Sequence, residues 1–279
     1  MIQFEQIGEI RKYRLSRSIL GRGLYFTACY WIDGLVVDTG CAHTLDELVS
    51  ALDGLPINCI VNTHGHEDHI AANAALQAKY GAKALVHPLA LPVLLAPREK
   101  QPLQLYRRIM WGYPAPSRGS ALGNKVETEH HRFEVIYTPG HSPDHICLYE
   151  PEKGWIFTGD AYIGGKDRAL RQDYDIWQII KSLKKIARLN PSLLFPGSGS
   201  VRKHPREEIL EKIEYLEEMG NRVLTLHGEG LGDRQISRRL FGREMPIAYF
   251  TMGHFTGKNL VRSYTVNRGG ISCKGSLWN

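Results

Sequence analysis

Residues 64–69 read His64-Gly65-His66-Glu67-Asp68-His69, and this cluster, the histidine box, carries the strongest signal in the sequence. The box follows the largely apolar run 57–61, which predicts a buried β-strand. Three imidazoles and two carboxylates so close together need partners when buried, and a divalent metal ion binds both kinds of group. The i, i+2 spacing puts the side chains of His64 and His66 on one side of an extended segment. Asp68 and His69 fall on the next turn, which indicates two adjacent metal ions.

Two later turns offer the same kinds of ligand. Residues 138–141 read Thr-Pro-Gly-His and residues 157–160 read Phe-Thr-Gly-Asp, and each turn is associated with a predicted β-strand. The glycines beside His141 and Asp160 allow the backbone to approach a packed site closely. A polar surface loop would explain one such cluster, but it does not explain all of them together. We therefore interpret the box and the two turns as parts of one metal centre.

With Asp38-Thr39-Gly40 upstream, these motifs resemble those of the metallo-β-lactamase superfamily, which has an HxHxDH box, a PGH turn and a GD turn. The resemblance covers the predicted catalytic domain, residues 1–205. It implies an α/β (α+β) fold, a four-layer αββα sandwich in which two sheets pack face to face with helices on both outer sides. The metal ions would then lie at one edge of the sandwich.

The resemblance also implies six metal ligands: His64, His66, Asp68, His69, His141 and Asp160. Asp68 and His69 would hold the second metal, Asp160 would bridge the two ions, and the remaining three histidines would hold the first. Asp68 would also act in catalysis, by orienting a metal-bound hydroxide or carrying its proton. Zinc is the expected ion in a histidine-rich site, although iron and manganese accept the same ligands, and one or two ions are expected.

One ligand of the family is replaced in this chain. The family has a further histidine in a PGHG turn after a late strand, whereas here Pro196-Gly197-Ser198-Gly199 places Ser198 at that position. A neutral hydroxyl is a poor ligand for zinc. Three alternatives follow: a water molecule fills the gap, His204 or another nearby histidine replaces the missing ligand, or the second site is weak or empty.

Four other residues lie in or near the motifs. Asp38 is predicted to brace the metal-binding loops by hydrogen bonding rather than to bind metal. Glu67 is predicted to face solvent or substrate. His145 either orients a ligand or is a hydrogen-bonded structural histidine. Tyr174 is predicted to be a packing residue.

Composition and charge divide the chain into two parts. The 279 residues are 43% hydrophobic and 23% charged, which excludes a disordered or collagen-like protein. Residues 1–219 carry 26 basic and 26 acidic side chains, whereas residues 220–279 carry 9 and 3, so the net charge of +6 lies in the last 60 residues. We therefore predict a small C-terminal domain, residues 206–279, whose basic face contacts a partner, forms a homodimer contact or is merely solvated.

The order of elements in this region resembles a winged-helix appendage found on one branch of the same superfamily. Residues 234–241 read as a basic helix that ends at Gly242, and a second segment follows at 252–264. Tyr264-Thr265-Val266 is rich in β-forming residues and is expected to begin a wing.

Targeting signals and disulfide patterns are weak. The five cysteines are scattered and never form a CxxC pair, which favours a reducing compartment. The N-terminus lacks the uninterrupted apolar core of a signal peptide, and the apolar stretch 84–96 is broken by Pro88 and Pro92. We expect a cytoplasmic protein without a membrane partner.

The sequence favours a metal-dependent hydrolase in which a metal-activated hydroxide cleaves an ester, thioester, lactone or phosphodiester. The substrate would be a small ester-like molecule. One alternative is a nuclease that acts on RNA through the basic region 206–279. Another is a regulatory or nucleic-acid-binding protein without activity, whose second metal site has decayed at Ser198.

Overall fold

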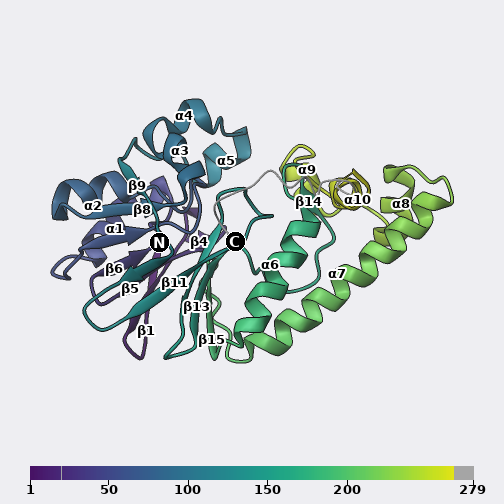
Figure 1. The fold of residues 1–279 in the computed structure, drawn as a ribbon. Coiled ribbons are helices and arrows are strands. Elements are labelled where there is room, and N and C mark those ends of the chain that lie inside the picture. Colours follow the sequence, from purple (N-terminus) through teal and green to yellow (C-terminus); the bar gives the residue numbers. More distant parts are fainter. Residues whose placement is uncertain (20, 267–279) are drawn as a thin grey trace. The chain divides into compact units, whose positions relative to one another are not determined.

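The computed structural model describes residues 1–19 and 21–266 (Figure 1). Contacts divide the chain into two compact units. The first contains residues 1–136, 143–163 and 191–204, and the second contains residues 137–142, 164–190 and the chain from Pro205 onward. The second unit therefore includes segments from the middle of the sequence as well as the C-terminal region. The predicted boundary between residues 205 and 206 stays a prediction.

The first unit contains a seven-stranded sheet in the order β1-β2-β5-β6-β7-β8-β9. Its strands are β1 (Ile2–Ile7), β2 (Ile10–Leu15), β5 (Thr27–Ile32), β6 (Leu35–Val37), β7 (Cys59–Val61), β8 (Lys83–Val86) and β9 (Gly119–Ala121). The β5–β6 hairpin turns at Asp33-Gly34, and both residues have positive φ angles. The strands from β6 to β9 are parallel, so the segments that follow β6 and β7 leave the sheet at the same edge.

A second sheet has five strands in the order β10-β11-β12-β13-β15. They are β10 (Lys125–Glu127), β11 (Arg132–Tyr137), β12 (Ile146–Glu150), β13 (Trp155–Gly159) and β15 (Leu193–Pro196). β13 and β15 pair in parallel, so the segments after both strands also leave at one edge. Asp160 follows β13 directly, and Ser198 follows β15 by two residues.

The two sheets pack face to face through aromatic side chains. The ring of Tyr30 in β5 lies 5.3 Å from the ring of Phe157 and 5.6 Å from that of Phe195, measured between centroids. The buried Tyr30 hydroxyl also donates a hydrogen bond to the carbonyl of Pro196 at 2.6 Å. Because that carbonyl ends β15, the bond ties the centre of one sheet to the end of a strand in the other.

Two helices cover the outer face of the seven-stranded sheet: α1 (Leu45–Ala51) and α2 (Asn73–Tyr80). Their side chains Leu48 and Leu76 are fully buried in one apolar cluster with Val36 of β6. α2 ends at Gly81, whose φ of 67° is the left-handed helix end expected for glycine. It begins only at Asn73, because His69 and the residues after it form the turn that holds the histidine box.

The proline-rich stretch 88–123 forms several short helices, as expected when proline repeatedly interrupts the backbone ladder. They are α3 (Leu91–Leu95), α4 (Pro97–Lys100) and α5 (Leu105–Met110), preceded by the 3₁₀ turn Pro88–Ala90. A second 3₁₀ turn, Ala42–Thr44, leads into α1, and a small hairpin, β3 (Ser18–Ile19) with β4 (Arg22–Gly23), precedes β5.

The second unit is mainly helical. It contains α6 (Ile176–Leu189), α7 (Pro205–Gly228), α8 (Asp233–Phe241), α9 (Pro246–Phe250), α10 (Gly257–Val266) and a two-stranded sheet of β14 (Leu170–Arg171) and β16 (Phe255–Thr256). Asp175 caps the N-terminus of α6, and its carboxylate accepts hydrogen bonds from the Trp177 and Gln178 amides. α6 and α7 pack against each other along their lengths (Figure 1).

α7 passes through Gly220, where the charge composition of the sequence changes. A Cβ atom at this position would lie 2.9 Å from the ring of Tyr264 in α10, so the glycine lets the two helices approach closely. The hydroxyl of Tyr264 donates a hydrogen bond to the Leu216 carbonyl of α7 at 2.7 Å. The charge change at Gly220 therefore does not mark a break in the fold.

The helix predicted at 234–241 is present as α8, and it ends at Gly242. The prediction of a β-strand at Tyr264-Thr265-Val266 is wrong, because these residues form the last turn of α10. Tyr264 is fully buried, and its packing overrides the β-forming tendency of its neighbours. A wing after Val266 would lie outside the described residues.

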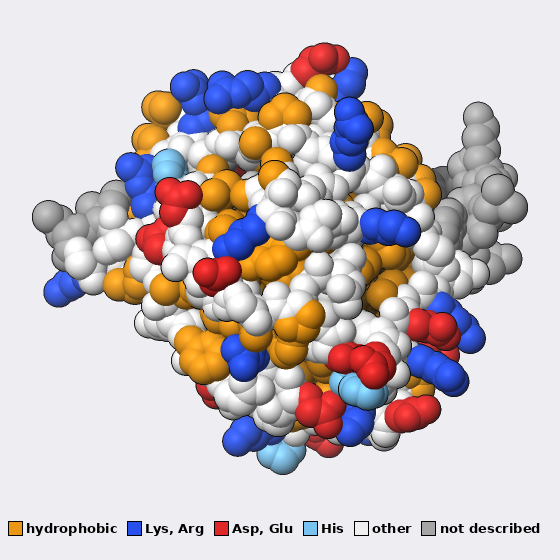
Figure 2. Space-filling model, turned by 90° about the vertical axis from the view of Figure 1, so that its left-hand side faces the viewer, with side chains coloured by type: hydrophobic (Ala, Val, Ile, Leu, Met, Phe, Trp, Pro, Cys, Tyr) orange, Lys and Arg blue, Asp and Glu red, His pale blue; other side chains and the backbone are white. Residues whose placement is uncertain are grey.

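No helix among the described residues is both long enough and apolar enough to cross a lipid bilayer. Figure 2 shows one face of the molecule, on which Lys and Arg side chains occur among Asp and Glu, with apolar side chains between them.

Candidate metal centre

The histidine box lies in the turn between β7 and α2, and buried amides hold this turn. The side chain of Asn62, at the end of β7, donates to the His69 carbonyl at 2.8 Å. The Thr39 amide donates to the same carbonyl, also at 2.8 Å. Asn73, the first residue of α2, donates to the Asn62 side chain at 2.7 Å. The end of β7 and the start of α2 therefore fix the backbone of the box from both sides.

Asp38 organises the centre as the sequence predicts. It follows β6 in a left-handed conformation, with φ of 56°, and is buried. Its carboxylate accepts hydrogen bonds from the amide and the hydroxyl of Thr63, both at 2.8 Å. Its Oδ2 also lies 2.8 Å from Nδ1 of His69. Because a carboxylate only accepts, Nδ1 carries a proton, and Nε2 is the nitrogen that can offer a lone pair to a metal ion.

The Nε2 atom of His69 is buried and has no hydrogen-bond partner among the described residues. It lies 3.6 Å from Oδ1 of Asp160 and 3.9 Å from Oδ2 of Asp68. A buried imidazole nitrogen without a hydrogen bond, facing two carboxylates, is the arrangement that a divalent cation satisfies. The residues present therefore fit a metal ion.

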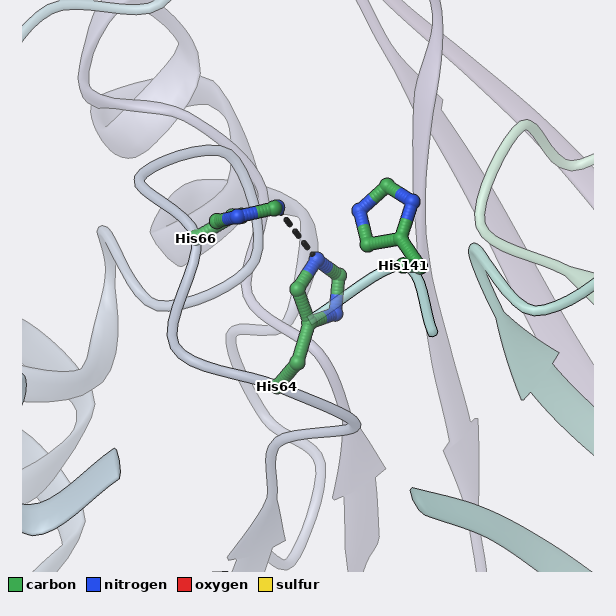
Figure 3. A group of neighbouring side chains, drawn as sticks. All are labelled: His64, His66 and His141. Atoms are coloured by element: carbon green, nitrogen blue, oxygen red, sulfur yellow. Dashed lines mark hydrogen bonds between the residues drawn. The ribbon is translucent and has the colours of Figure 1, made fainter. Parts of the chain in front are cut away.

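The structure brings the predicted ligands together in two groups. Ligand atoms of His64, His69 and Asp160 all lie within 4.8 Å of one another. The same is true of His64, His66 and His141, which Figure 3 draws. Nε2 of His64 and Nδ1 of His66 are 2.9 Å apart, so one of the two rings donates a hydrogen bond to the other (Figure 3). His64 thus belongs to both groups.

The centre has a strongly negative electrostatic character. Burial raises the pKa of the Asp68 carboxyl to about 7, and the nearby carboxylates of Glu67 and Asp160 act in the same direction. Burial alone would lower the pKa of His69, but the carboxylates of Asp38, Asp160 and Asp68 outweigh this effect and raise it well above its ordinary value. A cation would neutralise these acidic groups and displace their protons.

Two glycines allow Asp160 to reach the centre. Gly159 has φ of 45°, and a Cβ atom there would lie 2.4 Å from the Thr63 hydroxyl oxygen. A Cβ atom at Gly197 would lie 2.3 Å from Oδ1 of Asp160 and 3.0 Å from the ring of His69. The backbone itself therefore forms the wall beside Asp160, and no side chain fits at either position.

His145, for which the sequence left two roles open, positions Asp160. Its buried imidazole accepts a hydrogen bond from the Asp160 amide through Nε2 at 3.1 Å. The preceding residue, Asp144, accepts a hydrogen bond from the Gly65 amide at 2.6 Å. The two residues before β12 thus hold two different loops of the centre.

Ser198 directly follows Gly197, which contacts Asp160 and His69, and it is half-buried. Its carbonyl accepts a hydrogen bond from Nε of Arg14 at 3.3 Å. His204 is exposed and lies just before α7. The three alternatives for this side of the centre, namely a water molecule, His204 or no further ligand, stay predictions.

The prediction that Glu67 faces solvent or substrate is wrong. Glu67 is fully buried and accepts two hydrogen bonds from the guanidinium of Arg107 in α5, one of them from Nε at 2.7 Å. The sequence gives no signal for this pair, because 40 residues separate its members. Tyr174 was expected only to pack, yet its hydroxyl lies 3.2 Å from Nε2 of His141, so it contacts a candidate ligand.

The two-sheet fold and the His/Asp donor set together define a metal-binding α/β sandwich. A family model described as the metallo-beta-lactamase superfamily matches residues 22–198. The chain belongs to this superfamily. All of the predicted metal ligands, from His64 to Asp160, lie within the matched residues.

Three comparisons extend this result. The chain is 29% identical over 194 residues to a beta-lactamase-like protein 2 homolog of Drosophila melanogaster, covering 65% of this chain and 58% of that protein. It is 29% identical over 113 residues to an atrochrysone carboxyl ACP thioesterase of Aspergillus fumigatus, covering 40% of this chain and 35% of the relative. The crystal structure of a metallo-beta-lactamase family protein of Thermus thermophilus is similar with a TM-score of 0.68 at 18% identity, covering 94% and 95% of the two chains. This chain thus spans less than two thirds of the length of both curated relatives, and the structural match shows the fold.

Proposed function

We propose that the protein is a metal-dependent hydrolase that cleaves a small ester, thioester or lactone. The observation that carries the proposal is the buried Nε2 atom of His69, which faces the carboxylates of Asp68 and Asp160 and has no hydrogen-bond partner in the described chain. Nothing in a purely structural core requires three such groups to converge. The name of one relative, a thioesterase, supports the choice of an acyl substrate.

His64, His66 and His141 would hold one metal, and Asp68, His69 and Asp160 would complete the site for a second. Zinc is the proposed ion because imidazole and carboxylate suit it, with iron or manganese as alternatives. When bound, the metal supplies hydroxide at neutral pH and polarises the oxygen of the scissile group. The donor set accommodates one ion or two.

Side chains of this protein would carry out the proton transfer and hold the ligands in position. Asp68 would accept the proton of the attacking water on a carboxylate oxygen and pass it to the leaving group. Asp38 would hold His69 in the tautomer that presents Nε2. His145 would keep Asp160 in place through its amide.

The test compares metal content and hydrolysis in matched variants. Protein purified without chelator should contain a divalent metal and hydrolyse at least one member of a panel of chromogenic esters, thioesters and lactones. His66→Ala should lose hydrolysis by at least about a hundredfold while keeping its circular dichroism spectrum. His227→Ala, an exposed histidine at the end of α7, is the control and should keep both metal and activity. Full activity in His66→Ala, or wild-type protein without metal, would refute the proposal.

Two alternatives rest on the basic C-terminal region, where residues 220–279 carry nine basic and three acidic side chains. One is a nuclease that acts on RNA through this region, and the other is a regulatory protein that binds nucleic acid without hydrolysis. RNA cleavage that depends on His66 would favour the nuclease. RNA binding with neither metal nor hydrolysis would favour the regulatory protein.

We also propose a cytoplasmic location. The scattered cysteines support a reducing compartment, since Cys29, Cys41, Cys59 and Cys147 form no disulfide. Cys273 lies outside the described residues. A homodimer stays a prediction of the sequence, and analytical ultracentrifugation of the full chain would test it.

A further inference from the structure

The second unit contains a pocket of its own among α8, α9 and α10, with a volume of about 720 Å³. Its size is within the range of about 300–1,000 Å³ that small-molecule sites occupy. Four basic side chains from three different segments converge on it: Arg234 and Arg238 of α8, Arg243 of the following turn, and Lys258 of α10. Among the described residues that line it, Glu244 is the one carboxylate, which leaves a net charge of +3.

These cations have no carboxylate partner within the described chain, where none of the four takes part in an ion pair. The acidic groups nearby are already engaged. Glu244 accepts a hydrogen bond from the Gly257 amide at the start of α10, at 3.0 Å. Asp233, the first residue of α8, lies 3.5 Å from the Thr265 hydroxyl. The four cations are exposed, and no carboxylate of the described chain pairs with them, so their charge is available to a ligand.

Two apolar side chains also line the pocket. Tyr249 and Met252 line it and are 75% and 69% exposed, although both carry large apolar groups. The side chain of Asn259, on the opposite element α10, is fixed by hydrogen bonds to the carbonyls of Gly253 and His254. An exposed aromatic ring beside unpaired guanidinium groups offers a stacking surface and phosphate-binding groups in one place.

We propose that this pocket binds a small molecule of the nucleoside diphosphate class. Two adjacent phosphate groups carry a charge of about −3 at pH 7, because the terminal phosphate has its second pKa near 6. This charge complements the net charge of +3 in the lining. The base would stack on Tyr249. A polymer is less well matched, because all four cations line a single pocket.

The proposal is independent of the proposed hydrolysis, and its test measures binding alone. Isothermal titration calorimetry of the full chain with ADP is the first measurement. It should be repeated in His66→Ala, so that phosphate bound at the candidate metal centre is recognised. ADP and pyrophosphate should bind both proteins in a one-to-one complex, and adenosine should bind at least about tenfold more weakly than ADP.

Two arginines on α8 give a matched pair of variants. Both side chains are exposed, but Arg238 lines the pocket and its neighbour Arg239 does not line it. Arg238→Gln should weaken ADP binding by about tenfold or more, since it removes a charge-assisted hydrogen bond. Arg239→Gln makes the same change in net charge and should alter the affinity by less than about twofold.

Three outcomes would overturn the proposal. The first is no binding of ADP to the wild-type protein at millimolar concentration. The second is an equal loss in Arg238→Gln and Arg239→Gln, which would show that the attraction is a diffuse effect of charge. The third is that single-stranded RNA binds tightly, ADP does not compete with it, and titration with ADP gives no binding signal. That result would assign this surface to nucleic acid.

Discussion

The guanidinium of Arg107 in α5 donates two hydrogen bonds to the carboxylate of Glu67 in the histidine box, and both side chains are at most 4% exposed. Glu67 lies between two candidate ligands, His66 and Asp68. The pair therefore anchors the proline-rich segment 88–123 to the loop that carries the ligands. It also explains how Glu67 can be buried beside the acidic groups of the centre.

Breaking this ion pair from one side should be costly. Arg107→Met leaves the Glu67 carboxylate buried without a partner, so we expect the free energy of unfolding to fall by about 3–5 kcal/mol. The double variant Arg107→Met/Glu67→Met should recover most of that loss, since neither charge of this pair is then present. Urea unfolding measures both. Arg108→Met, an exposed neighbour on α5, is the control and should change stability by less than about 0.5 kcal/mol. A double variant as unstable as the single one would contradict this account.

Asp38 should matter for metal binding although it is not a ligand. Asp38→Asn keeps the shape of the side chain but weakens its hold on Nδ1 of His69. We expect metal affinity to fall by about 10- to 100-fold, measured by competition with a chelating dye. Asp46→Asn, at an exposed position in the first turn of α1, should leave the affinity unchanged. An unaltered affinity in Asp38→Asn would mean that other contacts fix the His69 ring.

Gly197 should be intolerant of any side chain. In Gly197→Ala the new Cβ atom would lie 2.3 Å from Oδ1 of Asp160, so Asp160 or the backbone has to move. We expect lower metal stoichiometry or affinity in this variant, measured by elemental analysis after dialysis. Gly123→Ala is the matched control, since a Cβ atom there meets nothing within 4 Å. Normal metal content in Gly197→Ala would show that the loop after β15 lies further from the metal than we infer.

Metal affinity should decrease as the pH falls. The pKa of Asp68 is raised to about 7, mainly by burial, so in the metal-free protein this carboxyl is largely protonated below pH 7. The metal must displace that proton as well as the one that the raised pKa of His69 keeps on its ring, so the apparent affinity should fall by more than about tenfold for each pH unit below 7. Calorimetry in buffers of different ionisation enthalpy counts the protons released. At pH 6 the wild-type protein should release about one proton more than Asp68→Asn, and equal release would contradict the prediction.

Local patterns predicted most of the elements that build the centre. The histidine box, the turn at His141 and the turn at Asp160 are each contiguous in sequence, so their ligand types and the strands before them could be recognised directly. The same holds for α8, because a basic helix that ends at a glycine has local start and stop signals. In each of these segments, the residues that determine the local structure and the ligand type are adjacent in the sequence.

The features that sequence patterns did not predict depend on distant partners. Glu67 looks like a solvent-exposed residue until Arg107 reaches it from α5. Tyr264 lies among residues that favour β-strands, yet it is helical. Its ring packs against Gly220 of α7, and its hydroxyl donates a hydrogen bond to the Leu216 carbonyl. β1 shows no clear alternation of apolar residues, and its Phe4 is 58% exposed, so its pairing with β2 gives little signal in the sequence.

The ligand-bearing loops leave two different sheets: the histidine box follows β7 of the seven-stranded sheet, and Asp160 follows β13 of the five-stranded sheet. An ion held by both loops would fasten the two layers together, so its binding free energy would add to that of folding. In a growing cell, the chains that lack metal would open more often and be degraded sooner. The abundance of this protein would then follow the supply of its ion, so that scarcity reduces the number of copies as well as the work each one does.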